Sequence, residues 1–372
     1  MIRIDEIYSS VFYPKISSNP RQSMHYFDPF GRTDIESLTV QPLIGKRDVC
    51  FLFWDQEPFY NEYIQHKNTI QDFNLKYVHH EVFKKCKNIT YNPKYYKKTN
   101  IGIKNLSKVH FVTSEKNSKS VVELCKEHEY IYDYYFFHGW AALDWYRGYN
   151  RTNLIPNYID REITNTFISP NRVVGGNRYH RIDLFKSMVK NNLIENNKIS
   201  FPKVCPYSNE EFNIDGVELP LLFDNETVED VTSCSSSKIN LWEQSKNSLL
   251  QVVTETVYKQ DTLHLTEKIF KPIVMQMPFV LVGAKNNLEY LRSYGFKTFG
   301  EFWDESYDSM ENDQRIDAVT KLLVDLNSLS LKEKAQLQKH IAPTVEHNFN
   351  WFYSHDYENL LWKELTTMMS QW

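Results

Sequence analysis

The chain has 372 residues, which is too long for a domain with a single hydrophobic core. We therefore expect two domains of about 150–180 residues each. Hydrophobic residues make up 41% of it and aromatic residues 15%, which excludes a chain that is disordered throughout. The net charge of −4 combines a lysine-rich segment, His79–His110, with eight lysines and one acid, and an acidic segment, Ser208–Val231, with eight acids and no lysine or arginine. The two segments therefore carry opposite local fields.

Cysteine usage and hydropathy exclude two further classes of protein. The five cysteines are scattered and lack the paired spacing of a zinc site, which favours reduced thiols and no bound metal. No apolar run approaches the roughly 20 residues of a transmembrane helix, and residues 1–6 lack the apolar stretch of a secretory signal. We therefore expect a cytoplasmic protein without a membrane span.

Short apolar runs alternate with helical patterns along the N-terminal half, which is typical of α/β proteins. The expected strands are Val49–Trp54, Val109–Thr113 and Tyr132–Phe137, and the expected helix is Ser118–His128. The first of these runs is apolar throughout, as expected for a strand that is buried on both faces of a parallel sheet.

The same pattern begins again in the C-terminal half, after a linker expected at Thr152–Ile163. It predicts strands at Asn165–Ser169, Leu249–Val257 and Phe279–Gly283, and helices at Arg178–Asn191, Thr266–Met275, Asn287–Tyr294, Leu331–His347 and Ser354–Met369. We predict an α/β fold of two Rossmann-like domains facing a cleft, with ligands beyond the carboxyl ends of the strands. The expected domains are residues 1–155 and 156–347, with a C-terminal helix in 348–372 that packs back on the first.

The most informative segment is Leu263–Gly283. Thr266 is a good helix N-cap, and Glu267 and Lys268 then fall in the first helical turn. A helix N-terminus offers unpaired backbone N–H groups and the positive end of the helix dipole, which suits a diphosphate. Lys268 adds a cation for the phosphates, and Glu267 can accept hydrogen bonds from two ribose hydroxyls. The spacing alone also fits an ordinary acidic first turn beside a solvated lysine.

This segment resembles the donor-site motif of the fucosyltransferase-like glycosyltransferases and is similar to phage and viral proteins that share the motif. The matching features are Thr-Glu-Lys at a helix start, the following Lys-Pro and then Pro-Phe-(apolar)-Gly, within a match over Leu263–Tyr307. The resemblance implies that Glu267 holds the ribose and Lys268 the phosphates of a UDP- or GDP-sugar. It also implies a two-Rossmann (GT-B) fold, inverting transfer of a hexose or pentose, and no obligatory metal or cofactor.

A second cluster opens the C-terminal half. It comprises a strand end at Asn171, a turn with Gly175-Gly176, and a helix that carries Arg178 and Arg181. A strand end, a glycine turn and a basic helix start together suit phosphate binding. In the resembling family an arginine early in this domain contacts the diphosphate, which makes Arg178 or Arg181 the candidate, with Asn171 beside it. An ordinary basic helix start is the alternative.

Transfer of a sugar to a hydroxyl needs a general base on the acceptor side. Asp55-Gln56-Glu57-Pro58 follows the strand Val49–Trp54 and so belongs at the carboxyl edge of its sheet. The resembling family has a Glu-x-Pro-like segment in a comparable place, which makes Glu57 or Asp55 the expected base. His138, beside Gly139 at another expected strand end, is the second choice. A helix-capping carboxylate and a structural histidine are the simpler alternatives.

The lysine-rich segment also contains aromatic residues, which suits contacts with phosphates and stacking on bases. The lysines expected to contact an acceptor are Lys84, Lys85, Lys94, Lys97 and Lys98. Because the acceptor belongs on the N-terminal side, we expect double-stranded DNA as a partner and hydroxymethylcytosine in phage DNA as the leading acceptor, reached by base flipping. A glycan or lipid-linked saccharide is the alternative acceptor. A non-catalytic sugar- or DNA-binding protein is the alternative function.

Overall fold

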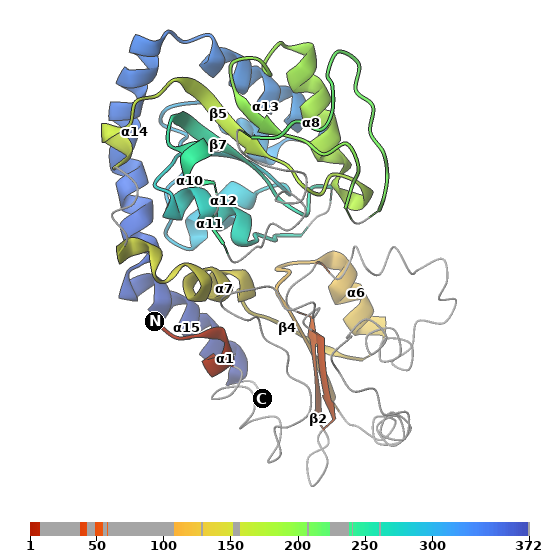
Figure 1. Ribbon diagram of the computed structural model, residues 1–372. Helices are drawn as coiled ribbons and strands as arrows, with labels where there is room; N and C mark the ends of the chain where they lie inside the picture. Colours follow the sequence, from red (N-terminus) through yellow and green to blue (C-terminus); the bar gives the residue numbers. More distant parts are fainter. Residues whose placement is uncertain are drawn as a thin grey trace. The chain divides into compact units, whose positions relative to one another are not determined.

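The computed structural model describes residues 1–7, 38–42, 49–54, 58, 108–127, 129–151, 157–206, 208–223, 238–239, 241–259 and 262–370. The chain divides into two compact units, shown in Figure 1: Met1–Trp145 with Glu358–Trp372, and Tyr146–Tyr357. A four-stranded sheet lies in each unit. The second unit thus begins at Tyr146, and the last residues of the chain belong to the first unit.

The sheet of the first unit has the order β1-β2-β3-β4. Strand β1 is antiparallel to β2, and β2, β3 and β4 are parallel to one another. Helix α6 connects β3 to β4, as a crossover between parallel strands must. The elements of this unit are β1 (Leu38–Pro42), β2 (Val49–Trp54), β3 (Lys108–Thr113), β4 (Ile131–Tyr134), α1 (Ile4–Ile7), α6 (Lys119–Glu127), α7 (Phe137–Tyr146) and α15 (His355–Met369).

Helix α7 replaces the end of a predicted strand. The strand expected at Tyr132–Phe137 ends at Tyr134, and the aromatic residues after it form α7. Trp140 in this helix is 1% exposed, and its ring packs edge to face on Trp362 of α15 with centroids 6.1 Å apart. The aromatic stretch therefore belongs to the hydrophobic core of this unit.

The sheet of the second unit has the order β6-β5-β7-β8, and all its strands are parallel. Its strands are β5 (Asn165–Pro170), β6 (Lys198–Ser200), β7 (Ser248–Thr254) and β8 (Phe279–Val282). Its α-helices are α8 (Tyr179–Lys190), α10 (Trp242–Ser245), α11 (Glu267–Val274), α12 (Asn287–Ser293), α13 (Asn312–Asn327) and α14 (Leu331–Phe352). Short 3-10 helices lie at Tyr149–Arg151, Tyr158–Asp160, Gly176–Arg178 and Ser306–Ser309. The prediction of an α/β fold with parallel sheets is confirmed.

The strand order of this sheet reverses between β5 and β7. From β5 the chain passes through α8 to β6 on one side, and it later passes from β7 through α11 to β8 on the other side. Right-handed crossovers in opposite directions place α8 and α11 on opposite faces of the sheet, as Figure 1 shows. Ligands of such sheets bind beyond the carboxyl ends of the strands at this reversal.

No helix in the part of the chain that the structure describes combines the length and the apolar character needed to cross a membrane.

Candidate functional site

Buried polar side chains join the strand ends at the reversal between β5 and β7. Asn171, the first residue after β5, accepts a hydrogen bond from Oγ1 of Thr254, the last residue of β7, at 3.1 Å. The backbone N of Asn171 donates to the carbonyl of Ser200, at the end of β6, at 3.2 Å. Asn171 is 4% exposed. Its contacts therefore hold three strand ends together at the point where a ligand of this sheet is expected.

Helix α11 begins at the same edge of the sheet, with the N-cap that the sequence predicts. Oγ1 of Thr266 accepts a hydrogen bond from the backbone N of Lys268 at 3.4 Å. The Lys268 ammonium lies 3.0 Å from Oε1 of Glu267 and donates to Oγ1 of Thr266 at 3.1 Å. The Lys268 side chain is 31% exposed and the Glu267 side chain 9%. Thr266, Glu267 and Lys268 thus form one connected polar group at a helix N-terminus.

Glu255 is a residue of this site that the sequence analysis missed. It follows β7 directly and is fully buried, and its carboxylate accepts hydrogen bonds from the backbone N of Thr266 at 3.1 Å and from Oγ1 of Thr266 at 2.6 Å. Burial raises the pKa of Glu255, whereas the nearby Lys268 ammonium and the bonds from Thr266 lower it. Glu255 therefore fixes Thr266, the N-cap of α11. The available signal was a polar run, residues 254–256, after an apolar strand.

Gly283, at the end of β8, makes room for this arrangement. A Cβ atom at Gly283 would lie 3.3 Å from Cβ of Glu255 and 2.6 Å from Nδ2 of Asn287. The second distance is shorter than a van der Waals contact permits, so a larger residue would displace Asn287. Close packing against Asn287 and Glu255 therefore explains the glycine of the Pro-Phe-(apolar)-Gly pattern.

The two candidate arginines have different surroundings. The guanidinium of Arg181 donates to the carbonyls of Val173 at 2.6 Å, Thr254 at 2.7 Å and Glu255 at 3.1 Å. Burial first, and then the charge of the neighbouring Arg178 guanidinium, lower the pKa of Arg181 to about 9. Arg178 ends a 3-10 helix just before α8 and is half-buried. Arg181 therefore belongs to the framework that holds the loop ends, while Arg178 lies nearer to solvent.

His180 is a buried histidine that contacts the first residue after β7. Its Nε2 lies 3.0 Å from the carbonyl of Glu255, and its ring stacks on Tyr258 with centroids 4.6 Å apart. The Arg315 guanidinium also lies over the Tyr258 ring, 4.7 Å from the centroid. Burial first, and then the charges of Arg181, Arg178 and Arg315, hold the pKa of His180 well below its usual value of 6.5, although its bond to Glu255 acts in the opposite direction. The imidazole is therefore neutral in the folded chain at pH 7.

We expect a pH-dependent loss of stability that His180→Gln removes. The folded-state pKa of His180 is depressed, so the unfolded chain binds a proton below pH 6.5 that the folded chain does not, and the stability present above pH 6.5 is lost as the pH falls. The difference in unfolding free energy between wild type and variant should shrink by about 1 kcal/mol from pH 7 to pH 5.5. Urea unfolding of both proteins at the two pH values measures this, and a difference that does not vary with pH would contradict it.

Of the candidate residues on the acceptor side, the structure describes only His138. Asp55, Glu57, Lys84, Lys85, Lys94, Lys97 and Lys98 lie outside the described residues. His138 was expected directly after a strand that ends at Phe137, and that placement is wrong because the strand ends at Tyr134 and His138 lies in the first turn of α7. It is 4% exposed, and its ring packs edge to face on Phe137 with centroids 5.2 Å apart. Within the described ranges, no three His, Cys, Asp or Glu side chains are grouped so that they could hold a metal.

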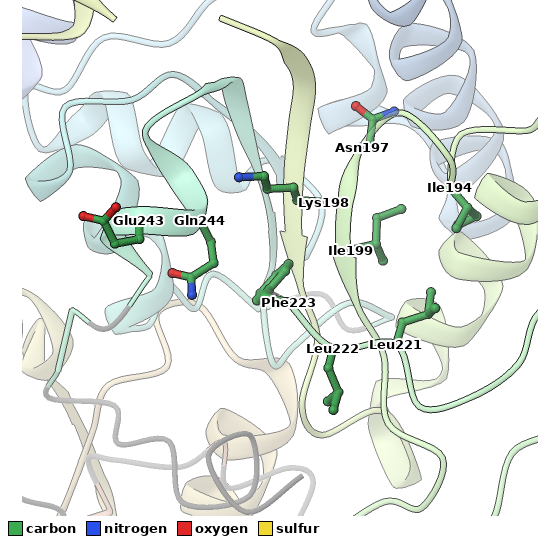
Figure 2. Close-up of a pocket in the computed structure, with 9 residues that line it drawn as sticks. All are labelled: Ile194, Asn197, Lys198, Ile199, Leu221, Leu222, Phe223, Glu243 and Gln244. Atoms are coloured by element: carbon green, nitrogen blue, oxygen red, sulfur yellow. The ribbon is translucent and has the colours of Figure 1, made fainter. Parts of the chain in front are cut away.

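A separate cavity of about 440 Å³ lies along β6, the edge strand of this sheet (Figure 2). Figure 2 shows Lys198 pointing toward α10, which carries Glu243 and Gln244. The lining residues are Ile194, Asn197, Lys198, Ile199, Leu221, Leu222, Phe223, Glu243 and Gln244. None of the residues that the sequence predicts for the site lines this cavity.

No protein-family model matches the chain. No curated protein matches its sequence either. Two solved structures, both of β-glucosyltransferase, show distant similarity. One is described as a DNA-modifying enzyme in the presence and absence of its substrate uridine diphosphoglucose; it has a TM-score of 0.28 and 10% identity over 64% of this chain and 67% of that chain. The other is the enzyme of phage T4, with a TM-score of 0.26 and 10% identity over 65% of this chain and 68% of that chain.

Proposed function

We propose that this chain is a glycosyltransferase that takes its sugar from a UDP- or GDP-sugar bound at the N-terminus of α11. The observation that carries the proposal is the connected group of Thr266, Glu267 and Lys268 beside the reversal in strand order. The helix N-terminus and the Lys268 ammonium suit the diphosphate, and the Glu267 carboxylate suits the ribose hydroxyls. Arg178 is the arginine we assign to the phosphates, because Arg181 already donates to three backbone carbonyls.

The reaction we propose is a single inverting displacement. The acceptor oxygen attacks the anomeric carbon of the sugar as a general base takes its proton, and the bond to the nucleoside diphosphate breaks. The negative charge that develops on the leaving diphosphate is stabilised by Lys268 and the α11 N-terminus. We assign the base to Glu57 or Asp55, on the basis of their place after β2 in the sequence. His138 is the weaker choice because it is buried in a helix.

The acceptor we propose is hydroxymethylcytosine in double-stranded DNA. The support is the lysine-rich segment His79–His110, whose cations and aromatic residues suit a phosphate backbone and exposed bases. Binding that depends on several phosphate contacts weakens steeply with added salt. A saccharide acceptor would show no such dependence, so the salt series separates the two acceptors.

Mass spectrometry of nucleosides tests the transfer directly. The chain is incubated with a panel of UDP- and GDP-sugars and with DNA that contains hydroxymethylcytosine, with cytosine DNA as the matched control. We expect a mass gain of one sugar on hydroxymethylcytosine alone, and at least a hundredfold loss of rate in the variant Asp55→Asn/Glu57→Gln, in line with the contribution of a general base. Absence of transfer from every donor, to this DNA and to a saccharide panel, would contradict the proposed activity.

A further inference from the structure

The two side chains that we assign to the two halves of the nucleotide are paired with each other in the structure. The Lys268 ammonium lies 3.0 Å from Oε1 of Glu267, and both are more than two-thirds buried. A cation that is held by a carboxylate is less available to a phosphate, and the paired carboxylate is less available to a ribose. We therefore expect full binding of either half of a nucleotide to part this pair.

Glu255 and Thr266 determine where the ammonium rests. Oγ1 of Thr266 gives its only proton to the Glu255 carboxylate at 2.6 Å, which leaves its lone pairs to accept from Lys268. The backbone N of Lys268 donates to this oxygen at 3.4 Å and the Lys268 ammonium at 3.1 Å, and the ammonium also donates to Glu267 at 3.0 Å. The Glu255 carboxylate accepts hydrogen bonds from both the backbone N and the hydroxyl of Thr266. Because Thr266 is fixed in this way, the Lys268 ammonium that donates to it is held next to Glu267.

We propose that the Lys268–Glu267 pair couples phosphate and ribose recognition, so that a diphosphate draws Lys268 away from Glu267 and thereby releases Glu267 to hold the ribose. The inference rests on the proposed donor site and adds to it a coupling between its phosphate and ribose contacts. An ammonium has three protons, so Lys268 can keep its bond to Thr266 while it turns toward a phosphate. The free energy of parting the pair is incurred once, whether one half of the nucleotide binds or both do.

A double-mutant cycle on nucleotide affinity tests this coupling. Each single variant removes one contact with the nucleotide, which lowers the affinity. It also removes the pair, so the free energy of parting the pair is no longer spent and offsets part of the lost affinity. The double variant Glu267→Gln/Lys268→Met loses both contacts. We therefore expect it to weaken UDP or GDP binding by about 5- to 10-fold more than the product of the two single effects, at the lower end of usual coupling factors.

Fragments of the nucleotide provide an independent measurement. The nucleoside is uridine if UDP binds the wild type and guanosine if GDP does. We expect pyrophosphate to raise the affinity of the wild type for this nucleoside about fivefold. In Lys268→Met the nucleoside should bind at least as tightly as in the wild type, and pyrophosphate should no longer help. Lys259→Met, which removes an exposed cation from the same loop, is the matched control and should behave as wild type.

The possible outcomes separate the coupling from the proposed function. If the single effects multiply to the double effect, or exceed it, while UDP or GDP still binds the wild type, the coupling is wrong and the donor site stands. If Lys268→Met weakens nucleoside binding, the coupling is likewise wrong. If neither UDP nor GDP binds the wild-type chain, both the proposed function and the coupling are overturned.

Discussion

Replacing Arg181 with methionine is expected to lower the free energy of unfolding by about 3 kcal/mol. The guanidinium of Arg181 donates to the carbonyls of Val173, Thr254 and Glu255, all within 3.1 Å. Each carbonyl left without a donor in the interior costs about 1–3 kcal/mol, whereas the Glu255 carbonyl keeps its contact with Nε2 of His180, and removing a buried charge offsets part of the sum. Methionine fills much of the same volume, so the loss reports the hydrogen bonds and not a cavity.

Urea unfolding at pH 7 measures this loss. Lys186→Met is the matched control, because Lys186 is exposed on the same helix, and it should change the unfolding free energy by less than about 0.5 kcal/mol. Arg181→Lys should fall between the two, since an ammonium cannot reach three carbonyls in the same geometry. If Arg181→Met proves as stable as the control, Arg181 does not hold the strand ends.

Lys268→Met is expected to weaken the binding of UDP or GDP about 3- to 30-fold, since a hydrogen bond to a charged group contributes about 1.5–3 kcal/mol and the variant saves about 1 kcal/mol because it has no pair with Glu267 to part. The Lys268 ammonium lies at the α11 N-terminus, in contact with Thr266 and Glu267. Its side chain is 31% exposed, so its loss should change the unfolding free energy much less than the loss of Arg181.

Isothermal titration calorimetry at fixed ionic strength measures this affinity. Lys259→Met again serves as the control for the loss of one positive charge and should leave the affinity within about twofold of wild type, because salt screens an exposed charge. A loss of affinity of the same size in both variants would indicate a general charge effect and not a contact between Lys268 and the diphosphate.

The sequence predicted those elements whose causes are local. Strands were predicted at Val49–Trp54 and Phe279–Gly283 from uninterrupted apolar runs, and the structure has strands at Val49–Trp54 and Phe279–Val282. Thr266 was identified as an N-cap because threonine satisfies the free N–H groups of a first turn, and the structure shows that bond. These features depend on residues within one turn or one strand of each other.

The features that the sequence did not predict depend on distant contacts. Strand β7 was expected to continue to Val257, because apolar residues resume there, but it ends at Thr254 and Glu255 turns inward to Thr266, eleven residues later. The choice between Arg178 and Arg181 was open in the sequence. It depends on which face of α8 packs against the end of β7, and periodicity alone does not fix this for an arginine.

Titration of the wild-type chain with UDP and with GDP, beside Glu267→Gln, tests the donor site most directly. We predict that one of the two nucleotides binds with a stoichiometry of one, and that Glu267→Gln weakens it about 5- to 10-fold through the loss of a charge-assisted hydrogen bond to the ribose. Failure of both nucleotides to bind the wild type, or equal affinity in wild type and Glu267→Gln, would contradict a donor site at the N-terminus of α11.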